Sequence, residues 1–214
     1  MSSQAQSRHD NWQHAHHFPS ADVQAESSKL GMWLFLLTEI LIFGAIFCAF
    51  AVYRYVHPEM FHEAHKELNV VVGLINTIVL IFSSFTMALA VRSAQLGQKK
   101  YASLLLVVTI LCAFVFLGIK SWEYSHKYAH GLFPGQATFA AHPLKLFFVI
   151  YFILTGLHGI HIVIGIGVLI WVLIRTLRGE FGPRYFTPVE NAGLYWHLVD
   201  LIWIYLFPVL YLLG

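Results

Sequence analysis

The feature that most constrains this chain is a series of five long apolar segments. They lie near Leu30–Val56, Val70–Val91, Ala102–Ile119, Pro143–Ile174 and Val189–Leu213. Each approaches or exceeds the ~20 residues that a helix needs to cross the hydrocarbon core of a bilayer. Because lipid offers no hydrogen bonds to the backbone, such segments form helices or closed β-barrels, and the two-residue alternation of barrel strands is absent. The sequence therefore predicts an all-α integral membrane bundle of five transmembrane helices.

The composition excludes other classes of protein. Hydrophobic residues make up 58% of the chain and charged residues 11%, whereas soluble domains carry roughly 25% charged residues. The net charge of +2 is small, and no basic patch with interleaved aromatic residues indicates a nucleic-acid partner. We expect residues 1–28 to be a polar N-terminal extension and residues 29–214 to form the five-helix domain. The extension lacks the apolar core of a signal peptide, and its histidines are spaced too loosely for a zinc finger.

The distribution of positive charge predicts the orientation of the chain. Five spans place the two ends on opposite sides of the membrane. The N-terminal side carries eight basic residues against five on the other side. Since Lys and Arg are enriched in cytoplasmic loops, we expect the N-terminus in the cytoplasm and the C-terminus outside.

Five polar side chains are predicted to lie deep in the membrane. Counting ~1.5 Å per residue from the N-terminal side places His197, Glu39 and Asp200 at ~12–16 Å, and His161 and His158 at ~20–24 Å. His158 and His161 share one helix face, as do His197 and Asp200, because each pair has i, i+3 spacing. Ionisable groups at this depth are expensive, so they indicate a functional or structural site.

Three interpretations of this polar belt remain open. The side chains could pair with one another and fix the packing of the helices. Two histidines could hold a haem between them, although a carboxylate beside each histidine suits a hydrogen-bonded network better. The carboxylates and histidines could also relay protons or ions. Separately, Glu123 follows Lys120 by three residues and predicts an ion pair at the outer end of its helix.

A stripe of glycines marks the fourth apolar segment, and no enzyme motif accompanies it. Gly156, Gly159, Gly165 and Gly167 would let a helix approach closely, either within this subunit or from another. We find no nucleophile with a base, phosphate-binding glycine loop or HExxH metal motif. A transporter would more often show inverted repeats or broken helices, and neither is present.

Four segments carry a resemblance to a known family. LGMWLFLLTE at Leu30–Glu39, WEY at Trp122–Tyr124, FILTGLHGIHIVIG at Phe152–Gly165 and YWHLVDLIWIYLFPVLYLLG at Tyr195–Gly214 closely resemble subunit III of the haem–copper oxidases. The resemblance covers nearly everything from Lys29 to Gly214. It implies a helical bundle without a redox centre of its own, packed directly against subunit I, with subunit II and other oxidase subunits nearby. The haems and copper would lie in those partner subunits.

The resemblance also assigns expectations to individual residues. Glu39 matches the intramembrane carboxylate of the family, and His158, His161, His197 and Asp200 match its signature segments. These residues would stabilise the subunit and support proton uptake by the catalytic subunit. Better-known members have seven helices and bind phospholipid in a cleft between the first two helices and the rest. This chain begins at what would be their third helix, as five-helix bacterial members do, and in some of those the missing spans are fused to the catalytic subunit.

Our leading hypothesis is therefore a non-catalytic accessory subunit of a respiratory terminal oxidase in the bacterial inner membrane. The family contains cytochrome c oxidases, quinol oxidases and a relative associated with nitric oxide reductases. The sequence alone favours the cytochrome c version and leaves the other two open. An independent proton-coupled transporter is the alternative from a different class.

Overall fold

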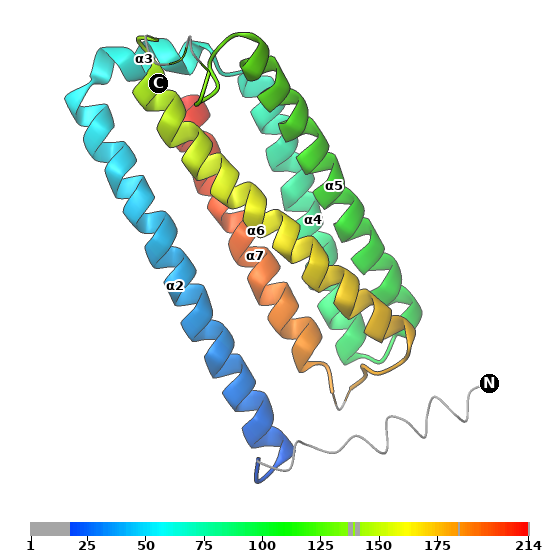
Figure 1. Ribbon diagram of the computed structural model, residues 1–214. Helices are drawn as coiled ribbons and strands as arrows, with labels where there is room; N and C mark the ends of the chain where they lie inside the picture. The colour runs from blue at the N-terminus through cyan, green and yellow to red at the C-terminus, as the bar shows by residue number, and fades with distance from the viewer. Residues whose placement is uncertain (1–17, 137–138, 140–141, 184, 214) are drawn as a thin grey trace.

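The computed structural model describes residues 18–136, 139, 142–183 and 185–213. The predicted all-α membrane bundle is confirmed. Among the described residues, five helices are long and apolar enough to cross a membrane. They are α2 (Ala21–Val56), α4 (Val70–Gln95), α5 (Lys99–Ala129), α6 (Lys145–Leu177) and α7 (Thr187–Phe207). A short helix, α3 (Pro58–Lys66), crosses one end of the bundle, and a π-helical turn, η2 (Pro208–Leu212), continues α7 (Figure 1).

Helix α2 begins earlier than the sequence indicated, at Ala21 rather than near Leu30. The side chain of Ser20 caps the helix by accepting a hydrogen bond from the backbone N–H of Val23 at 3.3 Å. Asp22 in the first turn complements the positive end of the helix dipole. Residues 21–28 of the predicted polar extension therefore belong to α2. The extension's histidines, His9, His14, His16 and His17, lie outside the described residues.

Helix α3 occupies the link between the first two spans, for which the apolar segments of the sequence predicted no element. Pro58 starts the helix, and Phe61 and Ala64 are buried beneath it. On the exposed side Lys66 donates to Glu63 at 2.8 Å, and the hydrogen bond and charge of Lys66 lower the pKa of the Glu63 carboxyl. An amphipathic helix at the end of a bundle is suited to the plane of the membrane interface.

Helix α7 is the central element of the bundle. It packs against α2, α4 and α6, while α5 packs against α4 and α6. Helix α2 runs along the edge, away from α4 and α5 (Figure 1). The largest fully buried side chains include Trp196 and Trp203 of α7, whose indole N–H groups donate to Ser83 and Thr77 of α4 at 2.9 and 3.1 Å.

The glycines of α6 differ in what they face. A Cβ atom at Gly165 would come within 2.7 Å of the ring of Trp196, so this glycine permits the close approach of α6 and α7. Gly159 and Gly167 have no neighbouring atom within 4 Å of such a position, and Gly156 has one at 3.9 Å. Close packing inside the subunit therefore rests on Gly165 among the four glycines that the sequence singled out.

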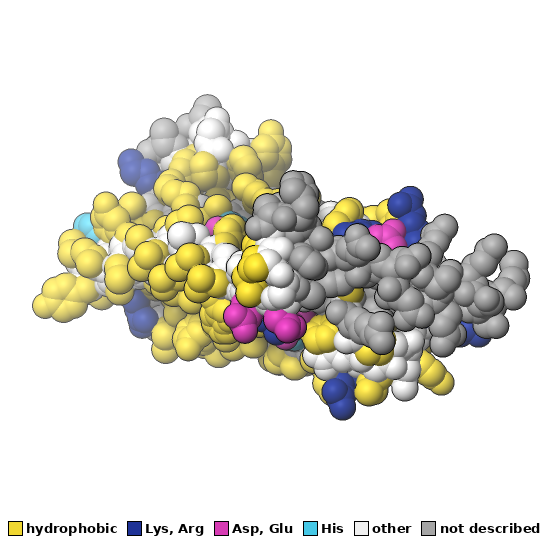
Figure 2. Space-filling model, turned by 90° about the horizontal axis from the view of Figure 1, so that it is seen from below, with side chains coloured by type: hydrophobic (Ala, Val, Ile, Leu, Met, Phe, Trp, Pro, Cys, Tyr) yellow, Lys and Arg dark blue, Asp and Glu magenta, His cyan; other side chains and the backbone are white. Residues whose placement is uncertain are grey.

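The flanks of the bundle are apolar, as a lipid-facing surface requires. Seen from the end where α2 begins, hydrophobic side chains cover the sides, while Lys and Arg side chains stand at several points around this end (Figure 2). Two turns at the same end contain Gly97 and Gly179, which adopt φ angles of 70° and 75° that favour glycine.

Candidate functional site: buried polar pairs in the bundle

A close contact between a carboxylate and a histidine joins Glu39 of α2 to His161 of α6. The carboxylate oxygen Oε2 lies 2.7 Å from the ring nitrogen Nε2, and both side chains are about nine-tenths buried. The other ring nitrogen, Nδ1, lies 2.8 Å from the carbonyl oxygen of Leu157. The hydroxyl of Tyr195 on α7 donates to the carbonyl of His161 at 3.0 Å. Three helices therefore meet at this pair.

The geometry determines how many protons the pair holds. A carbonyl oxygen can only accept, so Nδ1 of His161 carries a hydrogen and donates it to Leu157. The bond between Nε2 and Glu39 then needs one further hydrogen, located either on the carboxyl group or on the ring. In both arrangements the pair is neutral overall and shares one exchangeable proton. This is the chemistry that a proton store or relay requires, and it also avoids an unpaired charge in lipid.

His158 lies on the same helix but has different neighbours. Its ring is fully buried between Phe116 of α5 and Trp203 of α7, with centroid separations of 5.5 and 5.3 Å. Neither ring nitrogen has a hydrogen-bond partner among the described residues. An i, i+3 step rotates a side chain by about 60° around the helix axis, which is enough to direct His161 toward α2 and His158 toward α5 and α7.

His197 and Asp200 of α7 also separate. Nδ1 of His197 lies 2.7 Å from the hydroxyl oxygen of Ser84 on α4. Asp200 is 1% exposed, and neither of its carboxylate oxygens has a partner in the described part of the chain. The structure thus brings together Glu39 and His161 and pairs His197 with Ser84, whose side chain also neighbours Asp200. His158 is buried apart from both groups, so the five residues do not form one continuous belt.

A second buried cluster contains the predicted ion pair of α5. Lys120 donates to Glu123 at 2.9 Å, and both side chains are less than a tenth exposed. Tyr151 of α6 and Tyr211 of η2 each donate to Glu123, at 2.9 and 2.7 Å. The ammonium group of Lys120 also lies 2.7 Å from the Tyr211 hydroxyl and 4.6 Å from the centroid of the Trp203 ring. We call Lys120, Glu123, Tyr151 and Tyr211 the Lys120 cluster.

Sequence reasoning missed part of this cluster. Tyr151 and Tyr211 come from helices far along the chain, and nothing in their local sequence distinguishes them from other membrane tyrosines. Lys127 had a signal, because it continues the face of Lys120 and Glu123 by one more turn. It is buried, donates to the carbonyl of Glu67 at 3.2 Å and lies 5.2 Å from the ring centroid of Phe148.

The arrangement of ligating side chains limits the chemistry that this part of the chain can perform. Within the described ranges, no three His, Cys, Asp or Glu side chains are grouped so that they could hold a metal ion. His161 and His197 direct ring nitrogens at Glu39 and Ser84 instead of at each other. In this structure the ring nitrogens of His161 and His197 thus take part in hydrogen bonds within the bundle.

A bundle of five long apolar helices with polar side chains paired at its helix contacts defines a class of protein, the multi-pass helical membrane proteins. Comparison with known proteins identifies the family. The family model described as cytochrome c oxidase subunit III matches residues 8–214. The chain belongs to this family and is a multi-pass membrane protein that forms part of a haem–copper terminal oxidase together with other oxidase subunits.

Several individual relatives match over most of their length. The chain is 32% identical over 194 residues to cytochrome bo(3) ubiquinol oxidase subunit 3 of Pseudomonas aeruginosa, covering 88% of this chain and 86% of the relative. It is 31% identical over 214 residues to quinol oxidase subunit 3 of Bacillus spizizenii, covering 94% and 98%. A probable quinol oxidase subunit 3 of Staphylococcus aureus is 27% identical over 191 residues, covering 89% and 91%.

Proposed function

We propose that this chain is subunit III of a bacterial haem–copper oxidase that takes its electrons from quinol. The observation that carries the proposal is the set of relatives just described, which are named as quinol oxidase subunits and match nearly end to end. The sequence alone favours the cytochrome c version and leaves the quinol version open. The names of these relatives support the quinol version.

In this role the chain is accessory and leaves the redox chemistry to its partners. The haems and copper belong to the catalytic subunit I, against which this chain packs directly, with subunit II and further oxidase subunits in the same complex. The large apolar residues exposed along α2, such as Leu37 and Leu41, support a contact with lipid or with another membrane subunit. The Glu39–His161 pair stabilises the join between α2 and α6 and supports proton supply to the catalytic subunit.

The orientation that we propose is an inner-membrane protein with a cytoplasmic N-terminus and an external C-terminus. The structure adds one argument to the charge count. Lys120 and Lys127, which the count assigned to the outer side, are buried in the helix bundle, so they contribute little to the charge of the outer loops. The outer side therefore presents fewer exposed basic residues than the five that the sequence count assigned to it.

The experiment that tests the proposed function is purification through an affinity tag on this chain in mild detergent. We expect a coloured complex that contains a large haem–copper subunit and oxidises quinol but not reduced cytochrome c. Oxidation of cytochrome c by a complex with a copper-binding subunit would overturn the quinol proposal in favour of the first hypothesis. A complex with only b- and c-type haem would indicate the relative associated with nitric oxide reductases, and a lone colourless chain would revive the transporter.

A further inference from the structure

The spans do not close completely around the central helix α7. Helix α2 packs against α6, α6 against α5 and α5 against α4, so these four helices form an arc, and α7 packs against α2, α6 and α4 on its inner side. The two ends of the arc, α2 and α4, stand apart on opposite sides of α7 (Figure 1). One face of α7 therefore looks out through the opening between α2 and α4.

His197 lies on this open face of α7 and is half-buried. Its Nδ1 atom lies 2.7 Å from the hydroxyl of Ser84 on α4, which places the ring at the α4 edge of the opening. Leu201 and Tyr205 continue the same face at four-residue steps, and they are 49% and 60% exposed. We call His197, Leu201 and Tyr205 the α7 stripe.

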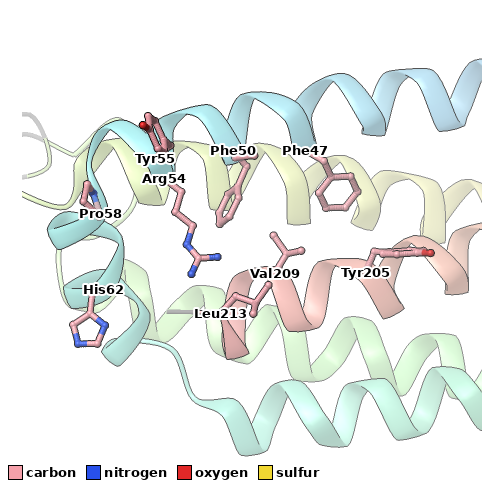
Figure 3. Close-up of a pocket in the computed structure, with 10 residues that line it drawn as sticks. Phe47, Phe50, Arg54, Tyr55, Pro58, His62, Tyr205, Val209 and Leu213 are labelled. Carbon is pink, nitrogen blue, oxygen red and sulfur yellow. The ribbon is translucent and has the colours of Figure 1, made fainter.

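Toward the end of α7 the opening deepens into a cleft of about 1020 Å³. Phe47 and Phe50 of α2 form one wall, and Tyr205 and Val209 form the other (Figure 3). Because Tyr205 belongs both to the cleft and to the α7 stripe, the two features form one continuous groove. Its walls are largely apolar, and it has room for several large side chains of a neighbouring molecule.

The Nε2 atom of His197 distinguishes between lipid and protein as the neighbour on this groove. It has no hydrogen-bond partner among the described residues. Within the apolar span Thr187–Leu212, His197 lies ~15 Å from the start and ~22 Å from the end. Acyl chains offer no hydrogen bond, so a polar atom that faces them without a partner costs free energy. A second membrane helix can supply the partner through a hydroxyl, amide or carbonyl group.

We infer that this groove binds a membrane-spanning helix of the haem–copper subunit, with a hydrogen-bonding group of that helix on Nε2 of His197. The inference rests on the proposed function, which supplies the partner, and it adds the face and the contact through which the two subunits join. The tautomer of His197 determines whether Nε2 donates or accepts the bond. Leu201, Tyr205 and Val209 supply apolar contact, and His197 fixes the position of the partner along the axis of α7.

The first test identifies the neighbour of the groove in intact membranes. A photo-crosslinking amino acid replaces Leu201. The matched control is Val115, which is 50% exposed and lies on α5, a helix that does not border the opening. Mass spectrometry should identify a membrane-spanning peptide of the haem–copper subunit at Leu201 and no such adduct at Val115. An adduct at Leu201 with phospholipid alone, or with a second copy of this chain, would overturn the inference.

The second test measures the haem content per copy of this chain, after purification through an affinity tag on it. His197→Leu should lose most of the haem, whereas His197→Gln keeps a hydrogen-bonding group and should retain more of it. Ser84→Ala removes the bond inside the subunit and leaves Nε2 in place, so its haem content should stay near that of the wild type. Equal losses in Ser84→Ala and His197→Leu would assign His197 to the fold of the subunit and overturn the docking role.

The outcomes separate this inference from the proposed function. If the tagged chain purifies with the haem–copper subunit but crosslinks to it from Val115 and not from Leu201, the groove is refuted and the proposed function stands. A tagged wild-type chain that purifies without haem would refute both. The crosslinking test decides the question if His197→Leu prevents the chain from accumulating.

Discussion

At the scale of single residues, burial in lipid forces polar groups into partnerships, and the two clusters solve this problem differently. Glu39 and His161 share one proton and so need no net charge. The Lys120 cluster keeps an ammonium and a carboxylate and surrounds them with two tyrosine hydroxyls. The Glu39–His161 pair can gain or lose a proton at one hydrogen bond. The Lys120 cluster would leave a charge unpaired if one member were removed, so we expect it to be structural.

Glu39→Gln tests the role of the shared proton. The amide can still form a hydrogen bond with His161, so we expect the oxidase to assemble normally. The substitution removes the exchangeable carboxyl proton, so we expect altered proton uptake or a shorter catalytic lifetime. The measurement is turnover and inactivation rate of the purified oxidase across pH. Glu26→Gln, on the exposed face of the same helix, is the matched control. Turnover and lifetime that match the wild type at every pH would rule out a role for the Glu39 carboxyl proton.

Glu123→Leu tests the Lys120 cluster. Breaking a buried ion pair from one side typically costs about 3–5 kcal/mol, because the remaining charge stays buried without its partner. The double variant Lys120→Met with Glu123→Leu replaces both charges by apolar groups, so it should recover much of that loss. Unfolding of the purified complex by heat or by a denaturing detergent gives the measurement. The single variant Lys120→Met completes the comparison. If the double variant loses as much stability as Glu123→Leu and Lys120→Met lose together, the two residues are not coupled.

At the scale of helices, the two faces of α6 have different tasks, and paired substitutions separate them. Gly165→Ala forces a Cβ atom against Trp196, which is fully buried and held by its bond to Ser83. We expect a loss of about 1–3 kcal/mol from overpacking. Gly159→Ala meets open space within the subunit and should be neutral or slightly stabilising, since alanine favours helix by about 1 kcal/mol over glycine. The measurement is the thermal unfolding of the oxidase complex that contains each variant. Equal stability of the two complexes would refute this account.

Helix type and number followed from the sequence because runs of apolar residues have few alternatives in lipid. Helix α3 did not, because its nine residues are polar on average and far too short to span a membrane; its amphipathic pattern was the available signal. The start of α2 was placed too late because the polar residues before Leu30 are as helical as those after it. Hydropathy detects where lipid begins, whereas a cap such as Ser20 determines where the helix begins.

The sequence predicted which residues belong to the site but not which of them contact one another. Glu39 and the three histidines stand out because each interrupts an apolar run. Which of them meet depends on the rotation of each helix, and a difference of 60° between His158 and His161 decides the partner. Tyr151 and Tyr211 acquire their role from Glu123, which lies far from both of them in the sequence. Pairing between helices is a property of packing, and a single sequence carries little information about it.

At the scale of the whole molecule, α7 holds the bundle together, so its removal should be more damaging than its length suggests. A chain ending before Thr187 lacks the element that packs against α2, α4 and α6. We expect it to be inserted but rapidly degraded, with no oxidase assembled. Co-expression of residues 187–214 as a separate segment should restore accumulation, because helices already stable in the membrane can associate afterwards. Immunoblotting and haem spectra of membranes measure both effects. Stable accumulation of the truncated chain by itself would contradict a central role for α7.

The central place of α7 also has a consequence in time. Synthesis delivers α2 first and α7 last, so most of the contacts that close the bundle become possible only when translation is nearly complete. Until then α4 and α5 can pair as a hairpin, while α2, with its carboxyl group at Glu39, stays in the lipid without a neighbour from α7. The entry of α7 into the membrane is therefore the step at which α2 and α4 gain the helix that packs between them.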